Sequence, residues 1–177
     1  MLLQSVERTS ELGSLGERLA AECLARAGFS EVVNLNCVRR HYPFADLIGV
    51  RNNVRFLIGV KTRNEMRRGR LKMNEAYNLV LVSNPKNQAL KLQGRTVEEI
   101  TRMALEEVHQ LARAERAKPA WITVPINATT ATFSAYFGLL DDLGCRRSVP
   151  MTYEARRRYL ALAEERHDDR IAPHLLN

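Results

Sequence analysis

The segment PFADLIGVRNNVRFLIGVKT, residues 43–62, constrains the fold more than any other part of the sequence. It contains two runs of apolar residues, 43–50 and 54–62, separated only by Arg51, Asn52 and Asn53. Asn tolerates the positive φ angles of tight turns, so this pattern predicts two antiparallel strands joined as a hairpin. A third strand is predicted just before them, over residues 31–39.

Two charged residues interrupt this otherwise apolar hairpin. In the strand at 54–62, alternation places Lys61 on the same face as Leu57 and Gly59. Asp46 interrupts the strand at 43–50, and it is expected to lie within a few ångströms of Lys61 across the hairpin. A simple ion pair at the end of the sheet would account for both charges. Buried ion pairs often add little net stability, however, so a pair alone does not explain why both residues are there.

A helix is predicted over residues 11–27, with Gly28 ending it. Glu17 falls in line with Ala20, Ala21 and Leu24, on the stripe that is expected to face the body of the protein. Exposure to solvent at the first turn, or attraction to the positive end of the helix, would explain this glutamate as well as a function would.

The segment at about 63–95 is predicted to be a basic insertion. It opens as a mobile loop, followed by a short element around 73–83 whose type the pattern leaves undecided. Its basic residues, together with the lysine before it, are Lys61, Arg63, Arg67, Arg68, Arg70 and Lys72. Such a run is usually a solvated surface, but here it follows directly on Lys61 and is also placed to hold phosphates.

The remaining pattern predicts two helices and two strands. The spacing of Thr96 and Glu99 is that of a capping box, which predicts a helix from there to about residue 117. Strands follow at 120–126 and 131–138, and VPMTYEARRRYLALAEER, capped by Thr152, predicts a closing helix. The aromatic residues Trp121, Tyr136 and Phe137 are expected to pack in the core rather than to stack on bases.

Composition limits the classes of function. The chain has 27 Lys and Arg against 20 Asp and Glu, a net charge of +7 that favours a polyanionic partner. Its three cysteines are widely spaced without a CxxC pair, and its four histidines show no HxxxH spacing, so neither a disulfide framework nor a zinc site is indicated. Without a signal peptide or membrane-length apolar run, residues 1–177 are expected to form one cytoplasmic domain with no membrane association.

The order helix, three strands, helix, strand resembles the core of the PD-(D/E)XK nuclease superfamily, which includes restriction endonucleases and Holliday-junction resolvases. The stretches LGERLAAECLARAGF, FADLIGV and FLIGVKTR carry the resemblance, which covers roughly residues 13–63. The fold class that it implies is α/β, with an αβββαβ restriction-endonuclease-like core. That core is a central mixed sheet flanked by helices, here with an extra strand and helix at the C-terminal end.

The resemblance also implies a site. In that superfamily the aspartate and a strand-three acid bind a divalent metal ion, Mg²⁺ or Mn²⁺, and the lysine two residues later stabilises charge or orients water. The matching positions are Asp46 and Lys61, with Glu17 as the helix glutamate and the Val60 backbone carbonyl as a further ligand. The strand-three acid is replaced by Gly59. Because Mg²⁺ commonly binds through one or two carboxylates, Glu17 and Asp46 are enough for one ion.

The leading hypothesis is therefore a magnesium-dependent endodeoxyribonuclease that hydrolyses phosphodiesters in branched or irregular DNA. Arg63, Arg67, Arg68, Arg70 and Lys72 would position the nucleic-acid backbone, and a homodimer is expected by analogy. The alternative is a catalytically inactive module of the same fold that binds nucleic acid or a protein partner. A third hypothesis, a protein-interaction scaffold, needs only an acidic partner.

Overall fold

The computed structural model describes residues 9–38, 42, 44–64, 66–67, 70–71, 93–127, 129–143 and 165–175. The helices are α1 (Thr9–Arg26), α2 (Leu35–Val38), α4 (Val97–Ala114), α5 (Leu140–Leu143) and the 3₁₀ turn η2 (Pro173–Leu175). The strands are β1 (Ser30–Asn34), β2 (Leu47–Arg51), β3 (Val54–Asn64), β4 (Met66–Arg67), β5 (Arg70–Leu71), β6 (Ala117–Asn127), β7 (Thr132–Leu139) and β8 (Glu165–Arg170).

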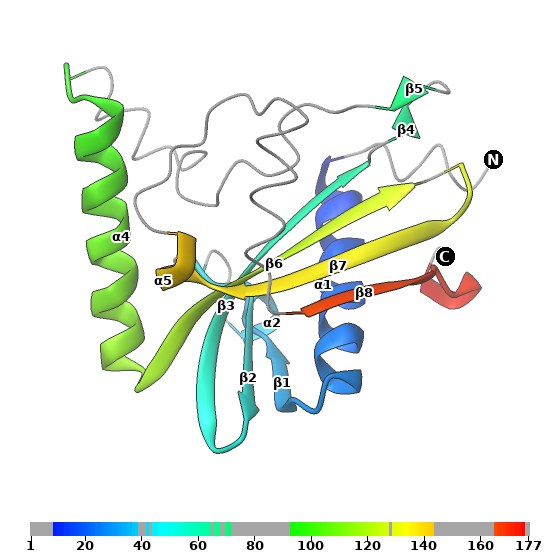
Figure 1. Ribbon diagram of the computed structural model, residues 1–177, viewed down its shortest axis with the longest axis horizontal. Coiled ribbons are helices and arrows are strands. Elements are labelled where there is room, and N and C mark those ends of the chain that lie inside the picture. The colour runs from blue at the N-terminus through cyan, green and yellow to red at the C-terminus, as the bar shows by residue number, and fades with distance from the viewer. Residues whose placement is uncertain are drawn as a thin grey trace.

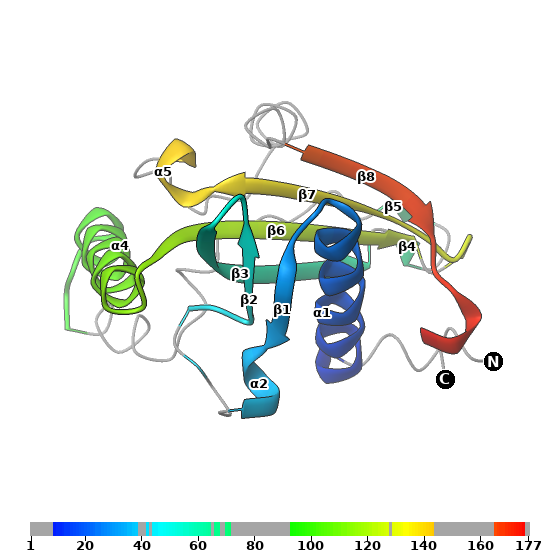
Figure 2. The same cartoon turned by 90° about the horizontal axis from the view of Figure 1, so that it is seen from below.

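Six strands form one curled mixed sheet in the order β1-β2-β3-β6-β7-β8 (Figures 1 and 2). β3 and β6 pair in parallel, and every other neighbouring pair is antiparallel. The chain is thus an α/β protein with a mixed sheet and a few helices. α4 supplies the crossover that a parallel neighbour requires, because β3 and β6 run in the same direction.

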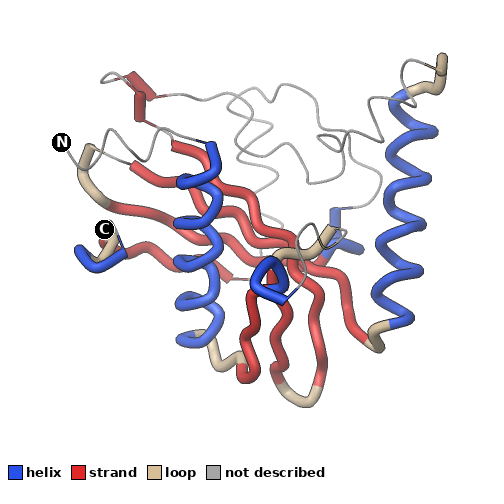
Figure 3. Tube along the Cα trace, turned by 180° about the vertical axis from the view of Figure 1, so that it is seen from behind, coloured by secondary structure: helices blue, strands red, loops and turns tan. Residues whose placement is uncertain are grey.

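The helix α1 lies across one face of the sheet, as Figure 3 shows from behind. Its buried residues Leu15, Leu19 and Leu24 belong to a core cluster that also includes Ile58 and Ile122 from the two central strands. The cluster is almost entirely apolar, so burial of these side chains is the main stabilising contribution on this face. Ala20 and Leu24 of the predicted stripe are buried in this cluster and Ala21 packs against it, so the stripe faces the body of the protein as predicted.

A smaller cluster lies on the opposite face. Leu57 of β3 and Ile48 of β2 pack there with Ala112 of α4. Side chains that alternate along β3 therefore serve two different cores, with Val60 on the α1 side and Leu57 on the α4 side. Lys61, which follows Val60, has the parity of Leu57.

The predicted hairpin is confirmed. Asn52 and Asn53 have φ angles of 53° and 61°, and Arg51 pairs with Val54 across the turn. Two consecutive positive φ angles match the twist of the flanking strands. The end of the first helix is also as expected, because Gly28 has a φ angle of 84° and Phe29 N–H donates to the Leu24 carbonyl at 3.0 Å.

Two predicted strands are too long. The strand expected over 31–39 ends at Asn34, because the Asn34 side chain accepts a hydrogen bond from Asn36 N–H and caps the short helix α2. The strand expected over 43–50 begins only at Leu47, because Phe44 has a φ angle of 65° and turns the chain out of the extended conformation. Asp46 therefore lies just before β2 rather than within it.

The C-terminal half also differs from the sequence prediction. The helix expected to reach 117 ends at Ala114, because Arg116, with a φ angle of 50°, turns the chain into β6. Residues 165 and 166, expected in a closing helix, belong to strand β8, where cross-strand pairing with β7 replaces helix formation. The rest of that predicted helix, Thr152 included, lies outside the described residues.

The basic segment is only partly described. β3 continues to Asn64, two residues beyond its predicted end, and Met66 pairs with Leu71 in the small β4–β5 hairpin where a loop was expected. The element predicted around 73–83 lies outside the described residues. No helix in the described part of the chain has the length and apolar character needed to cross a bilayer.

Two of the three aromatic residues Trp121, Tyr136 and Phe137 lie in the core. Trp121 and Phe137 are buried, and the Trp121 indole N–H donates to the Leu139 carbonyl at 3.2 Å. Tyr136 is only half-buried, and the Arg166 guanidinium lies 5.3 Å from its ring centroid. The expectation of packing roles is thus confirmed for Trp121 and Phe137.

Two glycines of α1 test how closely this helix packs on β3. A Cβ added at Gly16 would lie 1.5 Å from Thr62 Oγ1, whereas one added at Gly13 would meet nothing within 4 Å. We expect Gly16→Ala to lower the free energy of unfolding by about 1–3 kcal/mol through overpacking. Gly13→Ala is expected to raise it by up to about 1 kcal/mol through helix propensity. Urea unfolding of both variants measures the contrast, and an equally stable Gly16→Ala protein would contradict this packing.

Candidate active site

The candidate site lies where β2 and β1 stop and β3 continues. The last pair between β2 and β3 joins Leu47 with Ile58, and β1 ends opposite Leu47 at Asn34. β3 runs on to Asn64 and stays paired with β6 on its other side. The side of β3 beyond Ile58 is therefore available to side chains and loops instead of a neighbouring strand.

Asp46 takes the place of a strand partner at this point. Its backbone N–H donates to the Ile58 carbonyl at 2.9 Å, and its Oδ2 accepts a hydrogen bond from Val60 N–H at 2.7 Å. In a strand, the N–H and C=O of one residue point to the same side. The Val60 carbonyl therefore points toward the side of β3 on which Asp46 lies, as expected of a backbone ligand.

The turn before Asp46 is held by α2. Leu35 N–H donates to the Asp46 carbonyl at 2.8 Å, and Asn34 Oδ1 accepts from Asn36 N–H at 2.8 Å. The Asn34 cap thus fixes where α2 begins, and the bond from Leu35 ties that start to the residue before β2. Together these contacts place the Asn36 side chain between α1 and the start of β2.

Glu17 reaches the same place from α1. Its Oε2 accepts a hydrogen bond from Asn34 Nδ2 at 2.7 Å, and its Oε1 accepts one from Asn36 Nδ2 at 2.9 Å. The same Asn36 nitrogen lies 3.4 Å from Asp46 Oδ1. One amide NH₂ group therefore bridges the two carboxylates, and Glu17 and Asp46 converge although they are far apart in the sequence.

The environment of Asp46 disfavours its charge. Burial raises the pKa of this carboxyl group above its usual value, and the nearby negative charge of Glu17 raises it further. The Val60 N–H, the Lys61 ammonium and the Asn36 amide act in the opposite direction and lower the pKa, without outweighing burial. A cation at this point would relieve both unfavourable contributions, which is the electrostatic pattern of many functional carboxylates.

Lys61 is half-buried and close enough to Asp46 for their charges to attract. Its neighbour in register on β6 is Thr123, the one polar residue that is buried among those the structure describes. The two charges thus act on each other, while the predicted separation of a few ångströms stays a prediction. A hydrogen bond to Val60 nevertheless holds the carboxylate, which a simple ion pair does not explain.

Position 59 offers no side chain to the site. Gly59 is buried and lies opposite Trp121 in the register between β3 and β6. It has the parity of Leu57 and Lys61, so a carboxylate there would point to the same face as the lysine. The oxygen groups near this point are instead the carboxylates of Glu17 and Asp46 and the Val60 backbone carbonyl, and hard oxygen groups of these kinds suit Mg²⁺ or Mn²⁺.

No group of three or more His, Cys, Asp or Glu side chains in the described ranges is arranged to hold a metal ion. The acids Glu17 and Asp46 are only two, so a site of this kind needs oxygen ligands of other types. Asn34 and Asn36 were missed by the sequence prediction, which treated NLNCV as part of a strand. Asparagine in such a run was the available signal, since it favours caps and turns over strands.

The predicted phosphate-binding side chains lie outside the described residues. The backbone of Arg63, Arg67 and Arg70 is described, in β3, β4 and β5, but their side chains are not. Arg68 and Lys72 lie wholly outside the described residues. β3 carries the chain directly from Lys61 to Arg63, so at least this backbone is continuous with the candidate site.

No protein-family model, curated protein or solved structure matches this chain.

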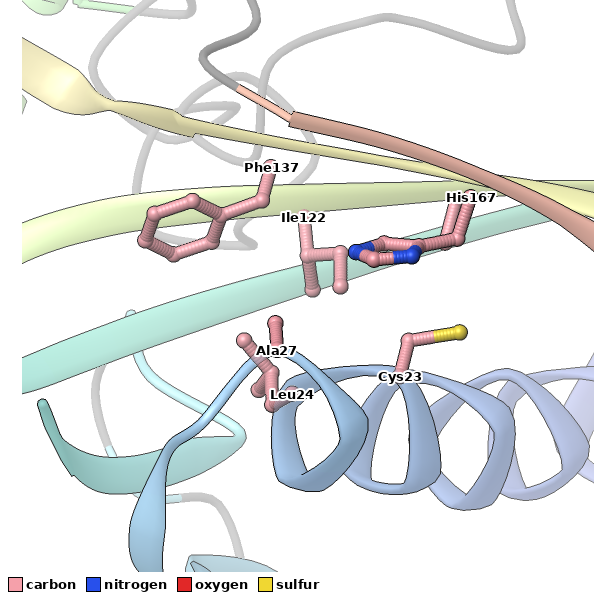
Figure 4. A pocket seen from close by; sticks show the side chains of 7 residues that line it. Cys23, Leu24, Ala27, Ile122, Phe137 and His167 are labelled. Carbon is pink, nitrogen blue, oxygen red and sulfur yellow. The ribbon is translucent and has the colours of Figure 1, made fainter.

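A small hollow lies on the α1 side of the sheet, between Cys23 and His167 (Figure 4). It is lined mostly by apolar side chains, among them Leu24, Ile122 and Phe137, and it has no space for a water molecule. Burial raises the pKa of the Cys23 thiol to about 11. The hollow therefore has the character of a packing defect with an inert thiol rather than of a reactive site.

The thiol of Cys23 should react slowly in the native protein. A pKa near 11 leaves roughly a hundredfold less thiolate at neutral pH than an ordinary cysteine has. Cys37, which is exposed, provides the internal comparison. Alkylation with iodoacetamide followed by peptide mass spectrometry should modify Cys37 first, and Cys23 only once the protein is unfolded. Equal rates at the two cysteines would contradict the burial of Cys23.

Proposed function

We propose that this protein is a metal-dependent endonuclease that hydrolyses phosphodiester bonds in DNA, and that its sheet is a variant of the restriction-endonuclease-like core. The observation that carries the proposal is the convergence of Glu17 and Asp46 on one Asn36 nitrogen, with Lys61 near enough to lower the pKa of Asp46. Sequence resemblance selected these two acids and the lysine, and they come from α1, from the turn before β2 and from β3.

In this proposal each residue has a separate role. Glu17, Asp46 and the Val60 carbonyl would hold one Mg²⁺ or Mn²⁺ ion, whose chemistry would be to polarise a phosphate and to lower the pKa of a water molecule. The Lys61 ammonium stabilises the negative charge that develops on the phosphate oxygens. The Val60 N–H keeps the Asp46 carboxylate oriented, and the arginines from Arg63 onward position the DNA backbone.

The metal site is tested by titration calorimetry with Mn²⁺ in the absence of DNA. We expect the wild-type protein to bind about one equivalent and Asp46→Ala to bind none, because that change removes one of the two acids. Asp141→Ala is a matched control, since Asp141 is well exposed and paired with His109 instead. Loss of binding in the control, or binding retained in Asp46→Ala, would contradict the proposed ligand.

The role of Lys61 is tested separately. Lys61→Ala should reduce cleavage of a branched DNA duplex by about 100-fold or more, the scale of removing one charge-stabilising group. Its affinity for Mn²⁺ should not fall. Lys118→Ala, which changes an exposed lysine on β6, should cleave like the wild type. Equal loss in both variants would assign the effect to general charge rather than to Lys61.

A second candidate function is favoured by Gly59, the one position where the expected acid is missing. The protein would then be an inactive module that binds nucleic acid through the same basic surface. If the protein is such a module, the wild type does not cleave DNA, and the Asp46→Ala variant binds DNA as tightly as the wild type does. DNA cleavage that appears only in the Gly59→Glu variant would identify a decayed enzyme. A steep salt dependence of DNA binding would argue against the third hypothesis, a scaffold for acidic proteins.

A further inference from the structure

Asn36 occupies the point on which the two acids converge. Its Nδ2 lies 2.9 Å from Glu17 Oε1 and 3.4 Å from Asp46 Oδ1. Two carboxylate oxygens that face one atom from different elements define a place for positive charge. The amide NH₂ group, which carries only a partial positive charge, fills that place and so acts as a stand-in for a cation.

The backbone of Asn36 is fixed, but its amide is able to turn. Its N–H donates to Asn34 Oδ1 at 2.8 Å, which holds the residue at the start of α2. The Nδ2 and Oδ1 atoms of an asparagine are nearly equal in size, and half a turn about the last side-chain bond exchanges them. In one orientation Asn36 donates to the acids, and in the other it offers them an oxygen.

We propose that Asn36 is the third side-chain ligand of the metal site, beside Glu17 and Asp46, and that it takes the place of the acid missing at Gly59. The inference rests on the proposed function. With no ion present, Nδ2 faces Glu17 and Asp46 and offsets their repulsion. When the acids hold a divalent cation, Oδ1 faces them instead, because an amide oxygen is a suitable ligand for Mg²⁺ or Mn²⁺ and an amide nitrogen is not.

Position 59 and position 36 are thus alternatives for the same task. An acid at 59 would come from β3, on the face of Lys61, whereas Asn36 comes from α2 beside Glu17. The substitution of a neutral ligand for a charged one predicts a weak site, since the affinity for a divalent ion depends on the number of ligand charges.

The test is Mn²⁺ binding without DNA, measured by calorimetry and by the loss of the free-ion electron paramagnetic resonance signal. Asn36→Asp should bind Mn²⁺ about tenfold or more tightly than the wild type, and Asn36→Ala about tenfold more weakly. Asn127→Asp is the matched control. It makes the same change of charge at a turn where Oδ1 only accepts hydrogen bonds from Thr129 and Thr130 N–H, so its affinity should stay within about twofold.

The outcomes separate the inference from the proposed function. If the wild type binds Mn²⁺ through Asp46 and Asn36→Ala binds it as tightly or more tightly, Asn36 is a competing bridge, and the inference alone is overturned. If only Asn36→Asp binds Mn²⁺, the new carboxylate creates a site that the natural chain lacks, and both the inference and the proposed function are overturned.

Two further outcomes decide the remaining cases. If neither the wild type nor a folded Asn36→Asp variant binds Mn²⁺, both the inference and the proposed function fail. If the third carboxylate prevents Asn36→Asp from folding, recovery of its circular dichroism spectrum on addition of Mn²⁺ supports the inference. Without such recovery, Asn36→Ala decides the question by itself.

Discussion

The hydrogen bond from Val60 N–H to the Asp46 carboxylate is the contact on which the candidate site depends. A β-strand that loses its neighbour leaves backbone groups that need partners. Here the neighbour ends at Leu47, and a side chain rather than another strand takes over at Val60. The site therefore begins where the pairing between β2 and β3 ends, and the backbone of β3 orients the Asp46 carboxylate.

Hydrogen bonds to backbone and side-chain groups also position the other residues of the site. Asn34 ends β1, caps α2 and donates to Glu17, so one residue links a strand, a helix and an acid. α1 must lie close to β3 for Glu17 to reach that amide, and Gly16 allows this approach beside Thr62. The apolar cluster between α1 and the sheet supplies the stability, while the polar network supplies only position.

Sequence reasoning predicted the parts of the fold that depend on local pattern. The hairpin followed from two asparagines between apolar runs, and the first helix from its stripe and Gly28, because those signals lie within a few residues. β8 was missed because its charged sequence, ERHDDR, carries no apolar alternation and its pairing with β7 is a tertiary contact. Charged residues on such an edge strand also discourage further pairing, which suits its place at the end of the sheet.

Sequence reasoning selected the two acids and the lysine of the candidate site but did not select its two asparagines. Asp46, Glu17 and Lys61 are conspicuous because charges interrupt apolar patterns, whereas Asn34 and Asn36 are ordinary in any turn. Their role depends on where β1 ends and α2 begins, which secondary-structure propensity alone did not indicate. The absence of an acid at Gly59 is plain in the sequence, but only the folded chain brings an amide from α2 to the pair of acids.

The central claim is that two acids and an amide meet to hold one divalent ion. Anomalous diffraction from a crystal soaked in Mn²⁺ tests it most directly. The account predicts a single strong peak within bonding distance of Glu17, Asp46 and the Val60 carbonyl, with the Asn36 oxygen turned toward it. An empty position with the Asn36 amide still bridging the two carboxylates, at Mn²⁺ concentrations that saturate known one-ion sites, would contradict it.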